Sequence, residues 1–134
     1  MKVTEFIEKY GKYDHKTTKM DEIAKAIDLH NYLPFSQKVN IINKLCDVLI
    51  VKNKEGFVTY DTFARYLLFT MTSLSAYTAL EVSTESLIVD NNNQLDITEF
   101  SNEYDLLMEN GWIFPILEKI GTDYNDFNSL LNMR

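Results

Sequence analysis

Apolar side chains recur every three or four positions along most of the chain, which is the spacing of helices that bury one face. Residues 3–10, VTEFIEKY, fit a short helix that ends at Gly11. Residues 17–30 fit a second helix, for which the Thr18 hydroxyl is a suitable N-terminal cap. Pro34 disfavours helical backbone at the residue before it, so we expect a break there.

The middle of the chain holds the two most apolar helix candidates. Residues 36–51 carry apolar side chains on more than one side, so this helix should be buried on several sides. A polar turn follows at 52–56, and residues 62–79 then form the most apolar stretch. Arg65 and several Ser and Thr residues argue against a membrane span there. We therefore expect 62–79 to be the central buried helix of a domain.

Residues 81–97 have no single clear pattern. They fit a two-stranded ribbon of 87–89 with 95–97, and they equally fit a helix end followed by a loop. A short β-contact between 57–59 and 95–97 is also compatible with the pattern.

Three further helices are expected in the last third of the chain. Asp96 and Glu99 have the spacing of a capping box at the start of the first, and Gly111 is a suitable stop for it. The second has Pro115 in its first turn, and Thr122 can cap the third. The expected ranges are 98–110, 112–120 and 123–134.

The composition agrees with this pattern of helices. The chain has 134 residues, of which 46% are hydrophobic, so it can fill the core of one domain. Only four Gly and two Pro are present, which disfavours a fold with many tight turns. We predict a mainly α single domain, residues 1–134, with about six helices around the helix 62–79 and room for one short β-ribbon.

Two polar stretches are similar to the calcium loops of EF-hand proteins: VKNKEGFVTYDTF, residues 51–63, and DNNNQLDITEF, residues 90–100. Such a loop needs oxygen ligands at positions 1, 3 and 5, Gly at 6 and a bidentate Glu at 12. Neither stretch meets this rule, so structural turns are favoured and a degenerate EF-hand pair is an alternative. The positions that fail are Val51 and Thr62 in the first stretch and Leu95 and Ser101 in the second.

The net charge of −7 excludes general binding to nucleic-acid phosphates. Residues 81–134 carry eleven acidic and two basic residues, so the negative charge is concentrated there. This pattern suits a solvated surface, and it also suits an acidic docking face for a basic partner. A third interpretation is an inhibitor of a host defence or nucleic-acid enzyme that mimics phosphates, which would need four carboxylates on one exposed face: Glu99, Glu103, Asp105 and Glu109.

Motifs for catalysis, metals and cofactors are missing from the sequence. His15 and His30 lie on different segments, and Cys46 is the single cysteine, so neither a zinc site nor an internal disulfide is expected. Gly-rich phosphate loops and nucleophile elbows do not occur. We therefore predict no enzyme activity and no cofactor. The N-terminus has no apolar signal-peptide core, which favours the cytoplasm.

Apolar side chains crowd around Pro115 and continue to the end of the chain. Because one short helix can hardly hide all of those near Pro115, we consider a protein interface there beside the alternative of core packing. The last helix keeps its apolar stripe to Arg134, so it could be cut short or completed by a partner. The candidate partner-binding residues are Trp112, Phe114, Ile116, Glu99, Glu103, Phe127, Leu130 and Leu131.

The sequence as a whole resembles the small, acidic, Asn- and Lys-rich helical proteins that bacteriophages encode among their structural and assembly genes. The stretches that carry this resemblance are YLPFSQKVNIINKLCDVLI, YDTFARYLLFTMTSLSAYTALEV and FNSLLNMR. The resemblance implies a virion component or assembly factor, of the head, tail or tail-assembly-chaperone type, in the host cytoplasm or the virion. Its partners would be proteins or further copies of itself, with no nucleic acid and no membrane.

Overall fold

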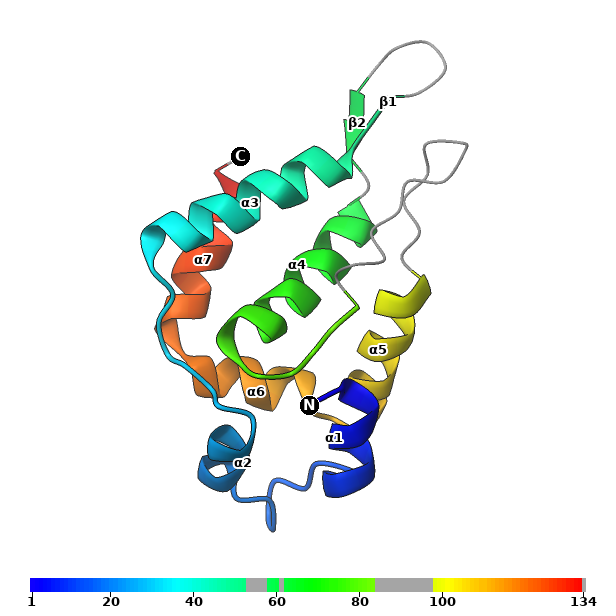
Figure 1. Ribbon diagram of the computed structural model, residues 1–134, viewed down its shortest axis with the longest axis vertical. Coiled ribbons are helices and arrows are strands. Elements are labelled where there is room, and N and C mark those ends of the chain that lie inside the picture. The colour runs from blue at the N-terminus through cyan, green and yellow to red at the C-terminus, as the bar shows by residue number, and fades with distance from the viewer. Residues whose placement is uncertain (53–57, 61, 84–97, 134) are drawn as a thin grey trace.

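The computed structural model describes residues 1–52, 58–60, 62–83 and 98–133, and for 48–52, 58–60, 62, 98 and 99 it describes the backbone alone. Figure 1 shows a mainly α fold, as the sequence predicts. The elements are α1 (Val3–Tyr10), α2 (Met20–Ala26), α3 (Phe35–Leu49), β1 (Ile50–Lys52), β2 (Val58–Tyr60), α4 (Thr62–Tyr77), α5 (Thr98–Glu109), α6 (Ile113–Ile120) and α7 (Thr122–Asn132).

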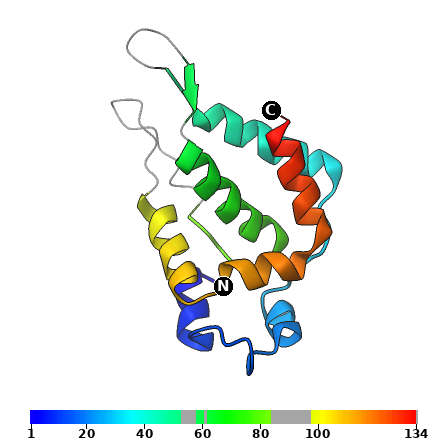
Figure 2. The ribbon, with the colours of Figure 1, turned by 180° about the vertical axis from the view of Figure 1, so that it is seen from behind.

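Helix α4 lies at the centre of the fold, as its apolar sequence predicts. Helices α3 and α5 pack against it, and α6 packs across it near the turn to α7 (Figures 1 and 2). Leu68, Met71 and Leu74 of α4 are fully buried, because neighbours cover the helix on several sides. The core of the domain therefore follows α4.

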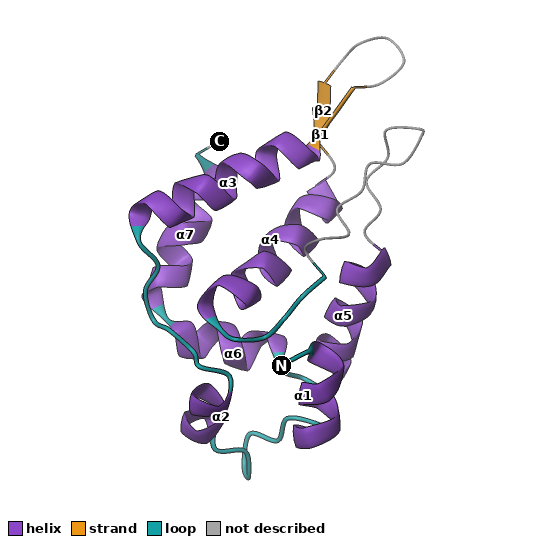
Figure 3. Ribbon diagram, viewed as in Figure 1, coloured by secondary structure: helices purple, strands orange, loops and turns teal. Residues whose placement is uncertain are grey.

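The two strands form one antiparallel hairpin that projects from the body of the molecule (Figure 3). Ile50 pairs with Tyr60 and Lys52 with Val58, on either side of the turn predicted at 52–56. The β-branched residues around this turn favour extended backbone, so the chain leaves the helix at Leu49. The strand 58–60 thus pairs with 50–52. Residues 84–97, which fit either a ribbon or a helix end followed by a loop, lie outside the described part of the chain.

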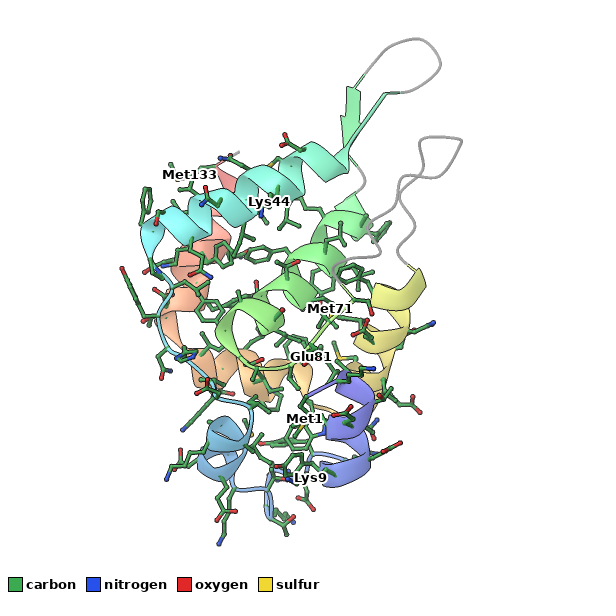
Figure 4. The ribbon with its side chains drawn as sticks, in the orientation of Figure 1. Met1, Lys9, Lys44, Met71, Glu81 and Met133 are labelled. Atoms are coloured by element: carbon green, nitrogen blue, oxygen red, sulfur yellow. The ribbon has the colours of Figure 1, made fainter. Side chains whose placement is uncertain are left out.

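The first helix is attached to residues far along the chain. The N-terminal ammonium donates to the Ala79 carbonyl at 3.2 Å and lies 3.6 Å from the Glu81 carboxylate (Figure 4). The Trp112 indole N–H donates to the carbonyl of Gly11 at 2.7 Å, and its ring meets Phe6 edge-on at 4.9 Å. These contacts place α1 against α5 and the turn that leads into α6.

Helix α2 is shorter than the predicted range of 17–30. The Thr18 side chain does not cap it, because its hydroxyl oxygen accepts a hydrogen bond from the Asp14 N–H at 2.9 Å instead. Asp28 adopts a φ of 50°, in the left-handed region, and this turns the chain away from the helix. The predicted stops at Gly11 and Gly111 both occur with positive φ, as does Gly121 after α6.

Candidate partner-binding groove

Helix α6 presents two different faces. Ile113, Ile116 and Ile120 point into the core and are fully or almost fully buried. Phe114 and Glu118 are four residues apart and therefore share a face, and both are exposed. The four-residue spacing thus places an exposed phenylalanine and a carboxylate side by side on α6.

A groove of about 530 Å³ lies beside this exposed face, between α4, α6 and the start of α7. Its volume falls within the range of about 300–1,000 Å³ that is usual for binding sites. Three aromatic rings from three helices line it, and Glu118 is the only charged side chain among the described residues that do so. The full lining is Tyr66, Thr70, Phe114, Leu117, Glu118, Gly121, Thr122, Tyr124 and Asn125.

Two of the three rings are held in place by contacts behind the groove. The hydroxyls of Tyr66 and Tyr104 form a hydrogen bond of 2.9 Å, and the two rings meet edge-on at 5.8 Å. The Tyr124 ring stacks on Phe69 at 5.8 Å. Since these rings are fixed before a ligand arrives, the groove is largely preformed.

Tyr104 and Tyr124 stay neutral at physiological pH, because their pKa values are raised. Burial, the hydrogen bond with Tyr66 and the charge of Asp105 raise the pKa of Tyr104 to about 12. Burial also raises the pKa of Tyr124, and the nearby Tyr66 adds to this effect. Glu118 therefore supplies the formal charge of the described lining.

The structure places most of the predicted partner-binding residues in the core. Among the candidates whose side chains the structure describes, Phe114 alone is strongly exposed, at 63%. Leu130 is partly buried against the core, and the other apolar candidates are 0–4% exposed, so a partner cannot reach them while the fold is intact: Trp112, Ile116, Phe127 and Leu131.

Trp112 shows why the local sequence misled. Both a protein interface and core packing were considered for the apolar groups around Pro115. For Trp112 the structure shows core packing, because α1 and the chain that follows it cover the ring, with Phe6 and Tyr13 packed edge-on at 4.9 and 5.4 Å. These residues are about a hundred positions away in the sequence, so no local pattern predicts the contact.

The acidic residues of α5 do not share one exposed face, contrary to the requirement of the phosphate-mimic hypothesis. Glu103 is half-buried and accepts a hydrogen bond from the Ser83 N–H at 3.0 Å. Asp105 and Glu109 are exposed, but they lie about 160° and about 120° around the helix from Glu103, so they face away from it. The side chain of Glu99 lies outside the described residues.

A buried polar cluster anchors the start of α7, and few features of the sequence indicate it. The carboxylate of Asp123 accepts hydrogen bonds from Lys38 Nζ at 2.7 Å, the Tyr77 hydroxyl at 2.7 Å and the Leu33 N–H at 2.9 Å. Thr122 does not cap α7, because Gly121 precedes the first turn and no side chain caps it. The one signal was an acidic residue in the first turn of a helix.

Opposing effects act on the pKa values in this cluster. Burial favours the neutral form of Asp123, but the hydrogen bonds from Lys38, Tyr77 and Leu33 and the charge of Lys38 outweigh burial, so the pKa of Asp123 is lowered. Burial and the adjacent carboxylate raise the pKa of Tyr77. The cluster is therefore an ion pair of Lys38 and Asp123 beside the neutral phenol of Tyr77. All of these groups take part in the contacts that hold α7.

The other end of α7 is held by Arg65 of the central helix. Its guanidinium donates to the Leu131 carbonyl at 3.0 Å and to Asn132 Oδ1 at 3.3 Å. Beyond this contact Met133 is 83% exposed (Figure 4). Both ends of α7 are thus fixed against α3 and α4, which keeps Tyr124 in its place in the groove wall.

Within the described ranges, no group of three or more His, Cys, Asp or Glu side chains could hold a metal ion. The described helices also include none with both the length and the hydropathy of a membrane span. In comparisons with known proteins, no family model, no curated protein and no solved structure matches the chain.

Proposed function

We propose that this protein is a non-enzymatic interaction module that docks a protein partner in the groove between α4, α6 and α7. The observation that carries the proposal is the exposure of Phe114, at 63%, on the rim of a preformed aromatic groove. Aromatic side chains in such positions supply most of the binding energy of many protein interfaces. Leu117 and Tyr124 extend the apolar surface from Phe114 toward the core.

The setting we propose is the assembly or structure of a bacteriophage particle, and its support is the resemblance of the sequence. In that setting the partner is another particle protein or a second copy of this chain. A contact between copies would make the particle mass depend on protein concentration, and substitution of Phe114 would abolish that dependence. Light scattering over a range of concentrations measures this directly.

Selection from a random peptide library tests the docking function without knowledge of the natural partner. We expect the wild-type protein to enrich peptides that share a sequence pattern, and Phe114→Ser to lose them, because this substitution removes the exposed ring from the groove. Phe35→Ser is the matched control, since Phe35 is also 63% exposed but lies on α3, away from the groove.

Both variants must retain the helical circular dichroism of the wild type for the comparison to count. The proposal is wrong, and the groove is not a docking site, in either of two outcomes. The peptides selected by the wild type bind the Phe114→Ser variant equally well, or the wild type enriches no peptide more strongly than the Phe114→Ser variant does.

A further inference from the structure

We propose that the groove recognises an arginine side chain within a basic segment of the partner. This inference rests on the proposed function, because it names the chemistry of the partner that docks there. It combines two observations: the three aromatic rings that meet in the groove, and the carboxylate of Glu118 beside them.

The rings provide the first part of a cation site. Tyr66, Phe114 and Tyr124 approach the groove from α4, α6 and α7 and line one cavity. Aromatic faces carry partial negative charge and attract a cation that lies within about 6 Å of the ring. Because Tyr66 and Tyr124 are fixed by Tyr104 and Phe69, a cation finds these faces already in position.

The charges around the groove provide the second part. None of the described residues that line it is basic, and Glu118 lies four residues after Phe114 on the same helix face. Lys119, next to Glu118 in the sequence, is bonded to Asp21 of α2, and Arg65, next to Tyr66, is bonded to the Leu131 carbonyl and Asn132 at the end of α7. Glu118 is therefore the charged group of the described lining, and a carboxylate attracts a cation and repels an anion.

Arginine fits these groups better than lysine does. Its planar guanidinium stacks on aromatic rings and donates two parallel hydrogen bonds to a carboxylate, whereas the ammonium of lysine is compact and more strongly hydrated. The lining also offers Thr122 and Asn125, which are exposed and whose oxygens can accept the remaining N–H groups. A phosphorylated or acidic segment would meet Glu118 without a compensating base in the described lining.

The test uses short acetylated and amidated peptides that carry arginine, citrulline, lysine or leucine between two leucines, titrated into the isotope-labelled protein and followed by amide NMR shifts. Citrulline has the shape of arginine without its charge. We expect shifts in the groove residues and about tenfold tighter binding of the arginine peptide than of the citrulline peptide.

Glu118→Gln should remove most of that difference, and Glu109→Gln is its control, because Glu109 is an exposed carboxylate outside the groove lining. Equal binding of the arginine and citrulline peptides would overturn the inference, as would equal effects of the two Glu→Gln variants or equal binding of lysine and arginine. If the leucine peptide binds in the groove as tightly as the arginine peptide, the inference fails while docking at Phe114 stands. Failure of the peptide-library selection would instead refute the docking function itself.

Discussion

Replacement of Asp123 by asparagine would test whether the buried cluster at the start of α7 holds the fold together. The carboxylate accepts three hydrogen bonds, and its side chain and that of Lys38 are only 10% and 7% exposed. Asparagine has nearly the same shape but offers one acceptor oxygen and no charge. Lys38 would then keep a buried ammonium without its counter-ion.

The magnitude follows from this burial. Loss of one partner of a buried ion pair destabilises a protein by about 3–5 kcal/mol. The entropy of unfolding is about 2.1 cal/mol/K per residue, so 134 residues give about 0.28 kcal/mol/K. Asp123→Asn should therefore lower the melting temperature by about 11–18 °C. Asp126→Asn, an exposed change of the same charge on the same helix, should shift it by less than about 2 °C.

The assay is thermal unfolding followed by circular dichroism for the single variants and for Asp123→Asn combined with Lys38→Met. The second substitution removes the unpaired ammonium, so the double variant should be more stable than Asp123→Asn alone. A drop of only a few degrees for Asp123→Asn, or a double variant that loses the sum of the two single effects, would refute the account of a buried pair.

The same cluster makes a prediction about acid. The pKa of Asp123 is lowered in the folded chain from its ordinary value of 3.8, so the folded state favours the carboxylate. The stabilisation is fully present above that value and is lost as the pH falls below it through the folded-state pKa. The difference in unfolding free energy between the wild type and Asp123→Asn should accordingly shrink at acidic pH, and a constant difference would contradict this.

Three further predictions concern single side chains. Trp112, the only tryptophan, is buried, so native fluorescence should be blue-shifted and should move to the red together with the loss of helix on unfolding; a red-shifted native spectrum would contradict its burial. In an alkaline absorbance titration Tyr104→Phe should lose the phenol that ionises near pH 12, and the stability that neutral Tyr104 provides should be present below pH 10 and decline above it. Cys46 is 4% exposed, so a thiol reagent should label it only at the rate of unfolding; immediate labelling of the native protein would refute this.

The helical periodicity of the sequence predicts the elements whose signals are local. Helix α1, the central helix α4 and the short helix α6 occur close to their expected ranges, because their apolar stripes, and in α1 and α6 the glycine that follows the helix, act within a few residues. The first two residues of the hairpin, Ile50 and Val51, were predicted as the end of the helix 36–51, whereas the turn at 52–56 was predicted. These apolar β-branched residues continue the helical stripe of α3, so their spacing alone does not separate the two conformations.

The candidate site could be predicted only in part. Phe114 was among the predicted partner-binding residues, but the groove also needs Tyr66 and Tyr124, which tertiary packing brings beside it. In the buried cluster, Asp123 and Lys38 are 85 positions apart in the chain, and no local rule pairs them. The sequence of one helix shows which face is apolar but not which distant segment will cover it.

The attachment of α1 to distant residues has a consequence for the order of folding. Gly11 is bonded to Trp112, which lies 101 positions further along the chain, and the closure of so long a loop slows folding relative to helical bundles with local contacts. At about 5–20 residues per second, a ribosome needs about 5–20 s to make the intervening chain. During that time the apolar face of α1, with Phe6 at its centre, has no native surface of α5 and α6 to bind. Helix α1 is synthesised first but is therefore among the last helices to pack in its native position. In a cell, chaperones can bind this nascent segment before it joins the core.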